Sequence, residues 1–206
     1  MAVFNESVFI NCPFDYRYKP LLDAMVFVVH DCGYVARTAL EHDDATQVRL
    51  HKIFQLIEGC RLGIHDISRT ELDPSTKLPR FNMPLELGIF MGAKQFGSDP
   101  HDTKRALVLD RDPYRYQQFC SDIAGQDPKS HDDDPATLMK AVRNWLRSNT
   151  PKGVMLPGPK RIWDRYLLFM EQLPEYCDRL HLDPSELIFN DYTTLAAAWL
   201  QENELP

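Results

Sequence analysis

Short apolar runs alternate with helix-like segments along the first half of the chain, and this alternation limits the fold more than any other feature. Runs rich in β-branched and aromatic residues lie at residues 7–12, 34–40, 61–67 and 105–110. Their length and composition are typical of buried strands. Segments of helical character stand between them, at residues 20–32, 46–58 and 82–96. This order predicts right-handed crossovers and a parallel sheet that is covered by helices on both faces.

Capping residues indicate where these helices begin and end. Gly33 follows the first helical segment as a stop signal, and Thr46 stands where an N-cap is expected for the second. Asn82 and Pro84 mark the start of the third. The predicted fold is therefore an α/β domain with helices of ordinary length between its strands.

Beyond Arg111 the pattern becomes helical, with helices expected over residues 114–123 and 135–148. The acidic segment 131–134 between them is interpreted as a solvated loop rather than a cation site. After a Pro- and Gly-rich linker, two more helices carry apolar stripes; the second opens at an Asp-Pro-Ser-Glu capping pattern that begins at Asp183. We therefore expect an α/β domain over residues 1–150 and a C-terminal helical hairpin over residues 151–206, docked on the sheet domain or on a second subunit.

The charge balance excludes several classes of function. The chain has 23 Lys and Arg against 30 Asp and Glu, a net charge of −7, and no basic cluster. Nucleic acids and anionic membranes are therefore not expected as partners. The longest apolar run, residues 24–29, is too short to cross a bilayer, and no signal peptide is visible. Five widely spaced cysteines favour reduced thiols in a cytoplasmic protein, and no pair has the spacing of a zinc site.

Ligands of open parallel sheets bind beyond the carboxyl ends of the strands, so the residues that follow each strand are the candidate site. Asn11 and Phe14 follow the first strand, Asp66 and Ser68 follow the third, and Asn82 begins the next helix. The chain lacks the Gly-x-x-x-x-Gly-Lys-Ser/Thr, Gly-x-Gly-x-x-Gly and Gly-x-Ser-x-Gly motifs. Kinase, simple dinucleotide dehydrogenase and nucleophile-elbow hydrolase functions therefore have no motif support. No metal ion is expected.

Glu86 is the most informative candidate. A helix start just before it predicts that its carboxylate lies in the first turn, where the helix dipole and free backbone amides favour the ionised form. Such a carboxylate suits a nucleophile or an electrostatic stabiliser in a reaction that passes through an oxocarbenium-like ion. A simple capping role is the alternative, and the residues alone leave both open.

Two segments resemble known families. Residues 82–88, Asn-Met-Pro-Leu-Glu-Leu-Gly, followed by Ala93, resemble the helix start that carries the nucleophilic glutamate of nucleoside 2-deoxyribosyltransferases. Residues 8–14, Val-Phe-Ile-Asn-Cys-Pro-Phe, are similar to the opening strand of that family and of TIR domains. The resemblance covers about residues 7–110. The tryptophan–cysteine pair of TIR domains and the Asp-Pro-Gly-Thr-type turn of the transferases are missing from this chain.

The resemblance implies a three-layer flavodoxin-like domain that breaks N-glycosidic bonds in nucleosides or nucleotides, with NAD as the leading substrate and no separate cofactor. By this resemblance Glu86 corresponds to the catalytic glutamate, and Asp66 with Ser68 to the polar group that meets ribose hydroxyls. Asn11 and Asn82 complete the expected substrate pocket, and Phe14 stacks the base. The TIR resemblance also implies a homo-oligomer that acts in bacterial antiviral defence. A non-catalytic nucleotide-sensing or adaptor module of the same fold is the alternative.

Overall fold

The computed structural model describes residues 4–73 and 75–204. Five parallel strands form a sheet in the order β2-β1-β3-β4-β5. The strands are β1 (Ser7–Asn11), β2 (Val35–Arg37), β3 (Leu62–Asp66), β4 (Arg105–Asp110) and β5 (Lys129–Ser130). This is the strand order of flavodoxin-like folds, in which the ligand crevice lies at the carboxyl ends of the strands. The predicted α/β fold class is confirmed.

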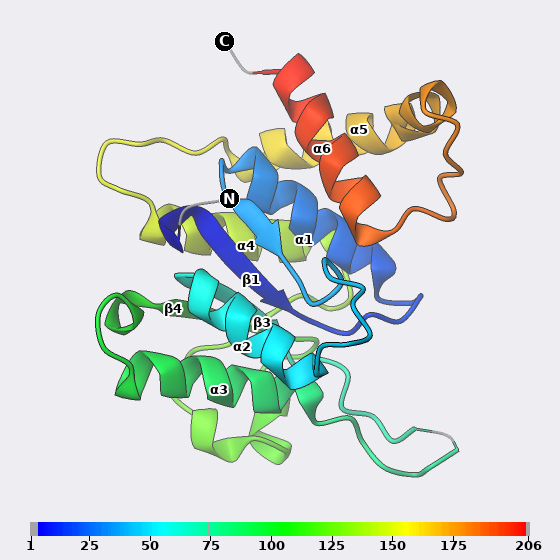
Figure 1. Ribbon diagram of the computed structural model, residues 1–206. Helices are drawn as coiled ribbons and strands as arrows, with labels where there is room; N and C mark the ends of the chain where they lie inside the picture. The colour runs from blue at the N-terminus through cyan, green and yellow to red at the C-terminus, as the bar shows by residue number, and fades with distance from the viewer. Residues whose placement is uncertain (1–3, 74, 205–206) are drawn as a thin grey trace.

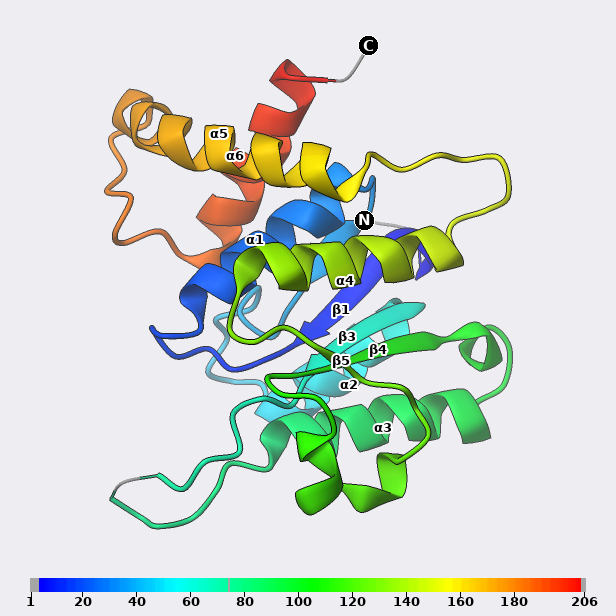
Figure 2. The ribbon, with the colours of Figure 1, turned by 180° about the vertical axis from the view of Figure 1, so that it is seen from behind.

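Helices cover both faces of the sheet, as Figures 1 and 2 show. One face carries α2 (Arg49–Gly59) and α3 (Asn82–Phe96), and the other carries α1 (Lys19–Asp31) and α4 (Pro135–Asn149). The C-terminal helices α5 (Pro159–Arg179) and α6 (Phe189–Glu202) lie outside α1 as a further layer. The expected helical hairpin therefore exists, and it packs on the sheet domain of its own chain.

The central part of helix α1 is apolar on all sides because it lies between the sheet and the hairpin. Residues 24–29 have no exposed surface. The ring of Phe27 stacks on Phe169 of α5, with centroids 5.3 Å apart, and contacts Trp199 of α6 at 6.0 Å. A helix without a polar face is stable only when it is covered on both sides. Residues 24–29, the longest apolar run of the sequence, thus form the centre of one continuous core.

Two helix predictions in the middle of the chain differ from the structure. The second helix begins at Arg49 and not directly after Thr46, because Asp44 binds the backbone amide and hydroxyl of Thr46 at 2.9 and 2.7 Å in a local turn. The helix predicted over residues 114–123 is wrong. Two short 3-10 helices stand there, Arg115–Gln118 and Ser121–Ile123.

The C-terminal half contains two further differences. The strand β5 was not predicted, because it has only two residues and no apolar pattern. The last helix begins at Phe189, whereas the capping pattern at Asp183 predicted an earlier start. Asp183 instead accepts a hydrogen bond from the amide of Ser185 at 2.8 Å, which closes a separate turn. Leu187 and Ile188 therefore belong to the connection before α6, and together with Phe189 they line a cavity beside the loops that follow β1 and β2.

Two general expectations can be compared with the described part of the chain. None of its helices combines the length and the apolar composition needed to span a membrane. All five cysteines are free thiols, in agreement with their wide spacing.

Candidate functional site

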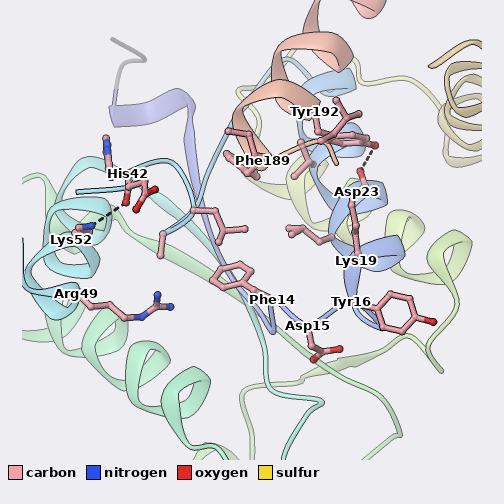
Figure 3. A pocket seen from close by; sticks show the side chains of 17 residues that line it. Phe14, Asp15, Tyr16, Lys19, Asp23, His42, Arg49, Lys52, Phe189 and Tyr192 are labelled. Carbon is pink, nitrogen blue, oxygen red and sulfur yellow. Dashed lines mark hydrogen bonds and ion pairs between the residues drawn. The ribbon is translucent and has the colours of Figure 1, made fainter. Parts of the chain in front are cut away.

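A cavity of about 670 Å³ lies beyond the carboxyl ends of β1 and β2 (Figure 3). The loops that follow these two strands form its floor, and the first turns of α1, α2 and α6 form its walls. Its volume falls within the range of roughly 300–1,000 Å³ that is common for small-molecule sites. The cavity is therefore a candidate binding site at the edge of the sheet where such folds hold their ligands.

Phe14, the residue that was expected to stack the base, follows β1 and lines this cavity. Its side chain is 36% exposed and lies in the middle of the site in Figure 3. Leu187 and Phe189, at the start of α6, also line the cavity. Tyr192 fixes that end of α6, because its hydroxyl donates a hydrogen bond to the carbonyl oxygen of Asp23 at 3.0 Å. The C-terminal hairpin thus supplies part of the site.

Three cationic side chains line the cavity, and two of them have partners. Lys19 pairs with Asp23 at 2.8 Å. Lys52 donates to the carbonyl oxygens of His42 and Asp44 at 3.0 and 2.7 Å.

Arg49 is the third cation of the lining. It makes no hydrogen bond or ion pair with any residue in the described part of the chain. Its guanidinium group extends from α2 into the cavity on the side of Phe14 (Figure 3). Arg49 is therefore the positive charge in this lining that is free to meet a ligand.

Glu86 lies beside this site but is largely buried. It is the fifth residue of α3, in the second turn, so the expected position in the first turn is corrected. Burial raises the pKa of Glu86 from its usual 4.5 to about 7, and the nearby charge of Arg49 opposes this shift. The helix dipole was expected to favour the ionised form, whereas burial favours the protonated form and is the largest cause of the shift in pKa. The carboxyl group is thus poised to change charge near neutral pH.

The burial of Glu86 also limits its access to the cavity. The side chain is 9% exposed, and it is not part of the cavity lining. Its position next to the end of β1 is evident from Cys12: burial and the charges of Asp66, Glu86 and Asp15 raise the pKa of that thiol well above its ordinary value. Asn82, four residues earlier, is exposed at the start of α3 and does not line the cavity either.

Asn11 joins the sheet to the helix that carries Glu86. Its amide nitrogen donates to the carbonyl oxygen of Met83 at 2.9 Å and lies 3.0 Å from Nδ1 of His65. An amide nitrogen can only donate, so Nδ1 of His65 accepts. Burial lowers the pKa of His65 to about 3, which keeps this imidazole neutral. Both amide hydrogens of Asn11 take part in these two contacts. The side chain of Asn11 therefore connects the sheet to the start of α3.

Asp66 is the centre of a fully buried polar network. Tyr18 donates its hydroxyl hydrogen to Asp66, the amide of Ser68 donates to Oδ1 at 2.8 Å, and Nε2 of His131 lies 3.0 Å from Oδ2. Burial alone raises the pKa of Asp66, but these three partners outweigh it and hold the pKa below its ordinary value. Neither Asp66 nor Ser68 has exposed surface. Within the described residues, no three His, Cys, Asp or Glu side chains gather as possible metal ligands.

No family model, no curated protein and no solved structure matches this chain. The functional assignment therefore rests on the fold and on the geometry of this site.

Four contributors to this region carried no recognisable signal in the sequence. Arg49 lies inside the helix that was expected over residues 46–58, so nothing marked it as the first residue of α2. Tyr18 belongs to no recognisable motif. His131 was assigned to a solvated acidic loop, yet it is buried against Asp66 because the unpredicted strand β5 leads the chain back to the sheet. The wall from α6 had no signal in the sequence, because residues 187–189 and Phe14 line the same cavity only in the folded chain.

Proposed function

We propose that this protein binds a nucleotide at the edge of its sheet and cleaves the N-glycosidic bond, or transfers the ribosyl group, with NAD as the leading substrate. The observation that carries the proposal is the Glu86 carboxyl group, largely buried and with a pKa of about 7. A carboxyl group held in this way lowers the stability of the ionised fold, and such groups are concentrated at functional sites.

The chemistry requires little more than an ionised carboxylate and an oriented sugar. The bond between C1′ and the ring nitrogen breaks, and its electron pair leaves with the base. The oxocarbenium-like ribosyl group that remains is stabilised by the Glu86 carboxylate, or forms a bond to it. Water or another acceptor then forms a bond to C1′ and loses a proton to the solvent. Where a bond to Glu86 had formed, it breaks and its electron pair returns to the carboxylate, which releases the sugar. Nicotinamide is cationic in NAD and leaves as a neutral molecule, so its departure needs no proton donor.

The position of Glu86 defines what must move during such a reaction. The carboxylate is next to the cavity but not in its lining, so it must turn toward the substrate when the cavity is filled. In this proposal Phe14 stacks the base; its place in the cavity lining and its partial exposure support that role. Asn11 acts through the backbone of Met83 and positions the first turn of α3.

A non-catalytic nucleotide sensor is the second candidate. The observation that favours it is the same 9% exposure of Glu86, since a binding module needs the cavity but not the carboxylate. The two functions differ in one measurable product, the free base.

The experiment compares wild-type protein with Glu86→Gln. Each is incubated with NAD and a panel of nucleosides, at low and at high protein concentration, and the products are separated by chromatography. Wild-type protein is expected to release free base, and Glu86→Gln is expected to release none while it keeps its circular dichroism spectrum. Glu58→Gln, which changes an exposed glutamate of α2, is the matched control and is expected to retain activity. Tight binding without base release by wild-type protein supports the sensor.

A further inference from the structure

The opposite sides of the cavity beyond β1 and β2 differ in chemistry. On the α2 side, Arg49 extends its guanidinium group into the cavity and makes no hydrogen bond or ion pair with the described residues. Its charge also acts on the nearby carboxyl group of Glu86. A guanidinium group offers a planar set of donors that matches a phosphate or carboxylate. The charge on this side therefore favours an anionic group of the ligand.

The side formed by α6 is apolar. Leu187, Ile188 and Phe189 line the cavity there, together with Phe14. Figure 3 shows Phe14 near the middle of the site, with Arg49 to its left and Phe189 above it. Ile188 is 61% exposed, so it contributes surface to the site and little to the core. Burial of such surface against a flat ring is favourable because it removes apolar area from water.

This apolar wall is held in place by contacts between α6 and α1. Tyr192 bonds to the backbone of Asp23 at 3.0 Å, and Nε2 of His30 lies 2.6 Å from the hydroxyl oxygen of Thr193. The wall is therefore a fixed part of the cavity and not a loose connection.

The carboxylates of the lining leave the cationic side open to an anion. Asp23 is paired with Lys19, and Asp15 accepts hydrogen bonds from the amides of Arg17 and Tyr18 at 3.1 Å. Asp43 is exposed and has no partner among the described residues. It is available to accept hydrogen bonds from sugar hydroxyls, which in a nucleotide lie between the base and the phosphate.

We infer that the cavity binds its nucleotide in one orientation, with a phosphate at Arg49 and the base between Phe14 and the start of α6. This inference rests on the proposed nucleotide ligand and names the contacts that select it. It assigns the C-terminal hairpin to the binding site. It also means that the cavity distinguishes a nucleotide from the corresponding nucleoside.

The first test measures binding by isothermal titration calorimetry, with adenosine 5′-monophosphate, adenosine and inorganic phosphate as probes. Wild-type protein is expected to bind the monophosphate about 10- to 100-fold more tightly than adenosine, the usual effect of a charge-assisted hydrogen-bonded pair. Arg49→Gln is expected to remove this preference and to leave adenosine binding unchanged. Arg161→Gln is the matched control, because it removes one exposed arginine from α5, outside the cavity lining.

The second test concerns the apolar wall. Ile188→Ala and Phe14→Ala are expected to weaken the monophosphate and adenosine by the same factor, several-fold for Ile188, and to leave the preference for the monophosphate intact. Leu180→Ala removes an equally exposed side chain outside the cavity and is expected to change nothing.

Three results overturn the inference: no binding of the monophosphate, equal affinity for monophosphate and adenosine, or a preference that survives Arg49→Gln. Unchanged affinities in both wall variants overturn the assignment of the base. These outcomes are separate from the test of catalysis. Oriented binding without base release would remove the enzymatic proposal alone. Base release by wild-type protein, together with a preference for the monophosphate that survives Arg49→Gln, would remove this inference alone.

Discussion

The side-chain amide of Asn11, the last residue of β1, donates a hydrogen bond to the carbonyl oxygen of Met83, 2.9 Å away in the first turn of α3. The same nitrogen contacts His65 of β3 at 3.0 Å. One side chain therefore fixes the start of α3 against two neighbouring strands, three residues before Glu86. Any movement of the catalytic candidate toward the cavity takes place relative to this anchor.

Removal of this anchor is expected to reduce both stability and turnover. Asn11→Ala leaves the Met83 carbonyl and His65 without their donor in a buried site, which costs about 1–3 kcal/mol of unfolding free energy. Urea denaturation measures this loss. In base-release assays kcat is expected to fall while KM changes little, because Asn11 does not line the cavity. Asn144→Ala on the exposed side of α4 is the control. An unchanged free energy of unfolding in Asn11→Ala would contradict the structural role of these hydrogen bonds.

The ionisation of Glu86 predicts an unusual pH dependence of stability. The folded pKa is about 7 against a usual 4.5, so between these values the folded state holds a proton that the unfolded state has lost. Stability from this group is therefore complete below pH 4.5 and falls as the pH rises to about 7. Glu86→Gln is expected to be up to about 3 kcal/mol more stable than wild type at pH 8 and equal to it near pH 4. A variant less stable at pH 8 would show that the carboxylate is structural.

The positive charge of Arg49 is expected to lower the pKa of Glu86. A nearby cation favours the ionised carboxylate, and Arg49 opposes the effect of burial. Arg49→Gln should therefore move the pKa of Glu86 above 7, which a carbon-13 NMR titration of the glutamate carboxyl groups can follow. Arg161→Gln serves again as the control. An unchanged pKa of Glu86 in Arg49→Gln would show that the charge of Arg49 does not act on this carboxyl group.

Base release is expected to follow the ionised fraction of Glu86. The nucleophilic or stabilising role needs the carboxylate, so kcat should rise with pH and reach half its maximum near pH 7. In Arg49→Gln the midpoint should shift upward with the pKa. A rate that falls across pH 6 to 8 would assign the protonated acid to the reaction instead.

His30 of α1, which contacts Thr193 of α6, is expected to make the protein less stable as the pH falls. Burial lowers the pKa of His30 from 6.5 to about 4, so the unfolded state takes up a proton first as the pH falls through this window. Stability should decrease between pH 6.5 and 4 by up to about 3 kcal/mol from this group. His30→Gln should show a smaller decrease in urea titrations across that range. An equal decrease in wild type and variant would assign the acid sensitivity to other groups.

The sheet and most of its helices were predictable because each depends on its own residues. The bounds of α3 and β4 agree with the expectation at both ends, since strong apolar patterns and clear stop signals define them. The prediction failed where the local pattern was weak: the helix expected over residues 114–123 is two short turns, and β5 has no apolar pattern.

The candidate site was predictable only in part. The sequence alone predicted a parallel sheet between helices, and with it the carboxyl ends of the strands as the place where Phe14 and Glu86 were expected. Tertiary structure decided that Glu86 is buried, that Arg49 is the charge beside it, and that α6 forms a wall of the cavity. The physical reason is that pKa, burial and cavity shape depend on residues brought together from distant segments. No local pattern records that the hairpin packs on α1, and that packing is what brings α6 to the binding edge.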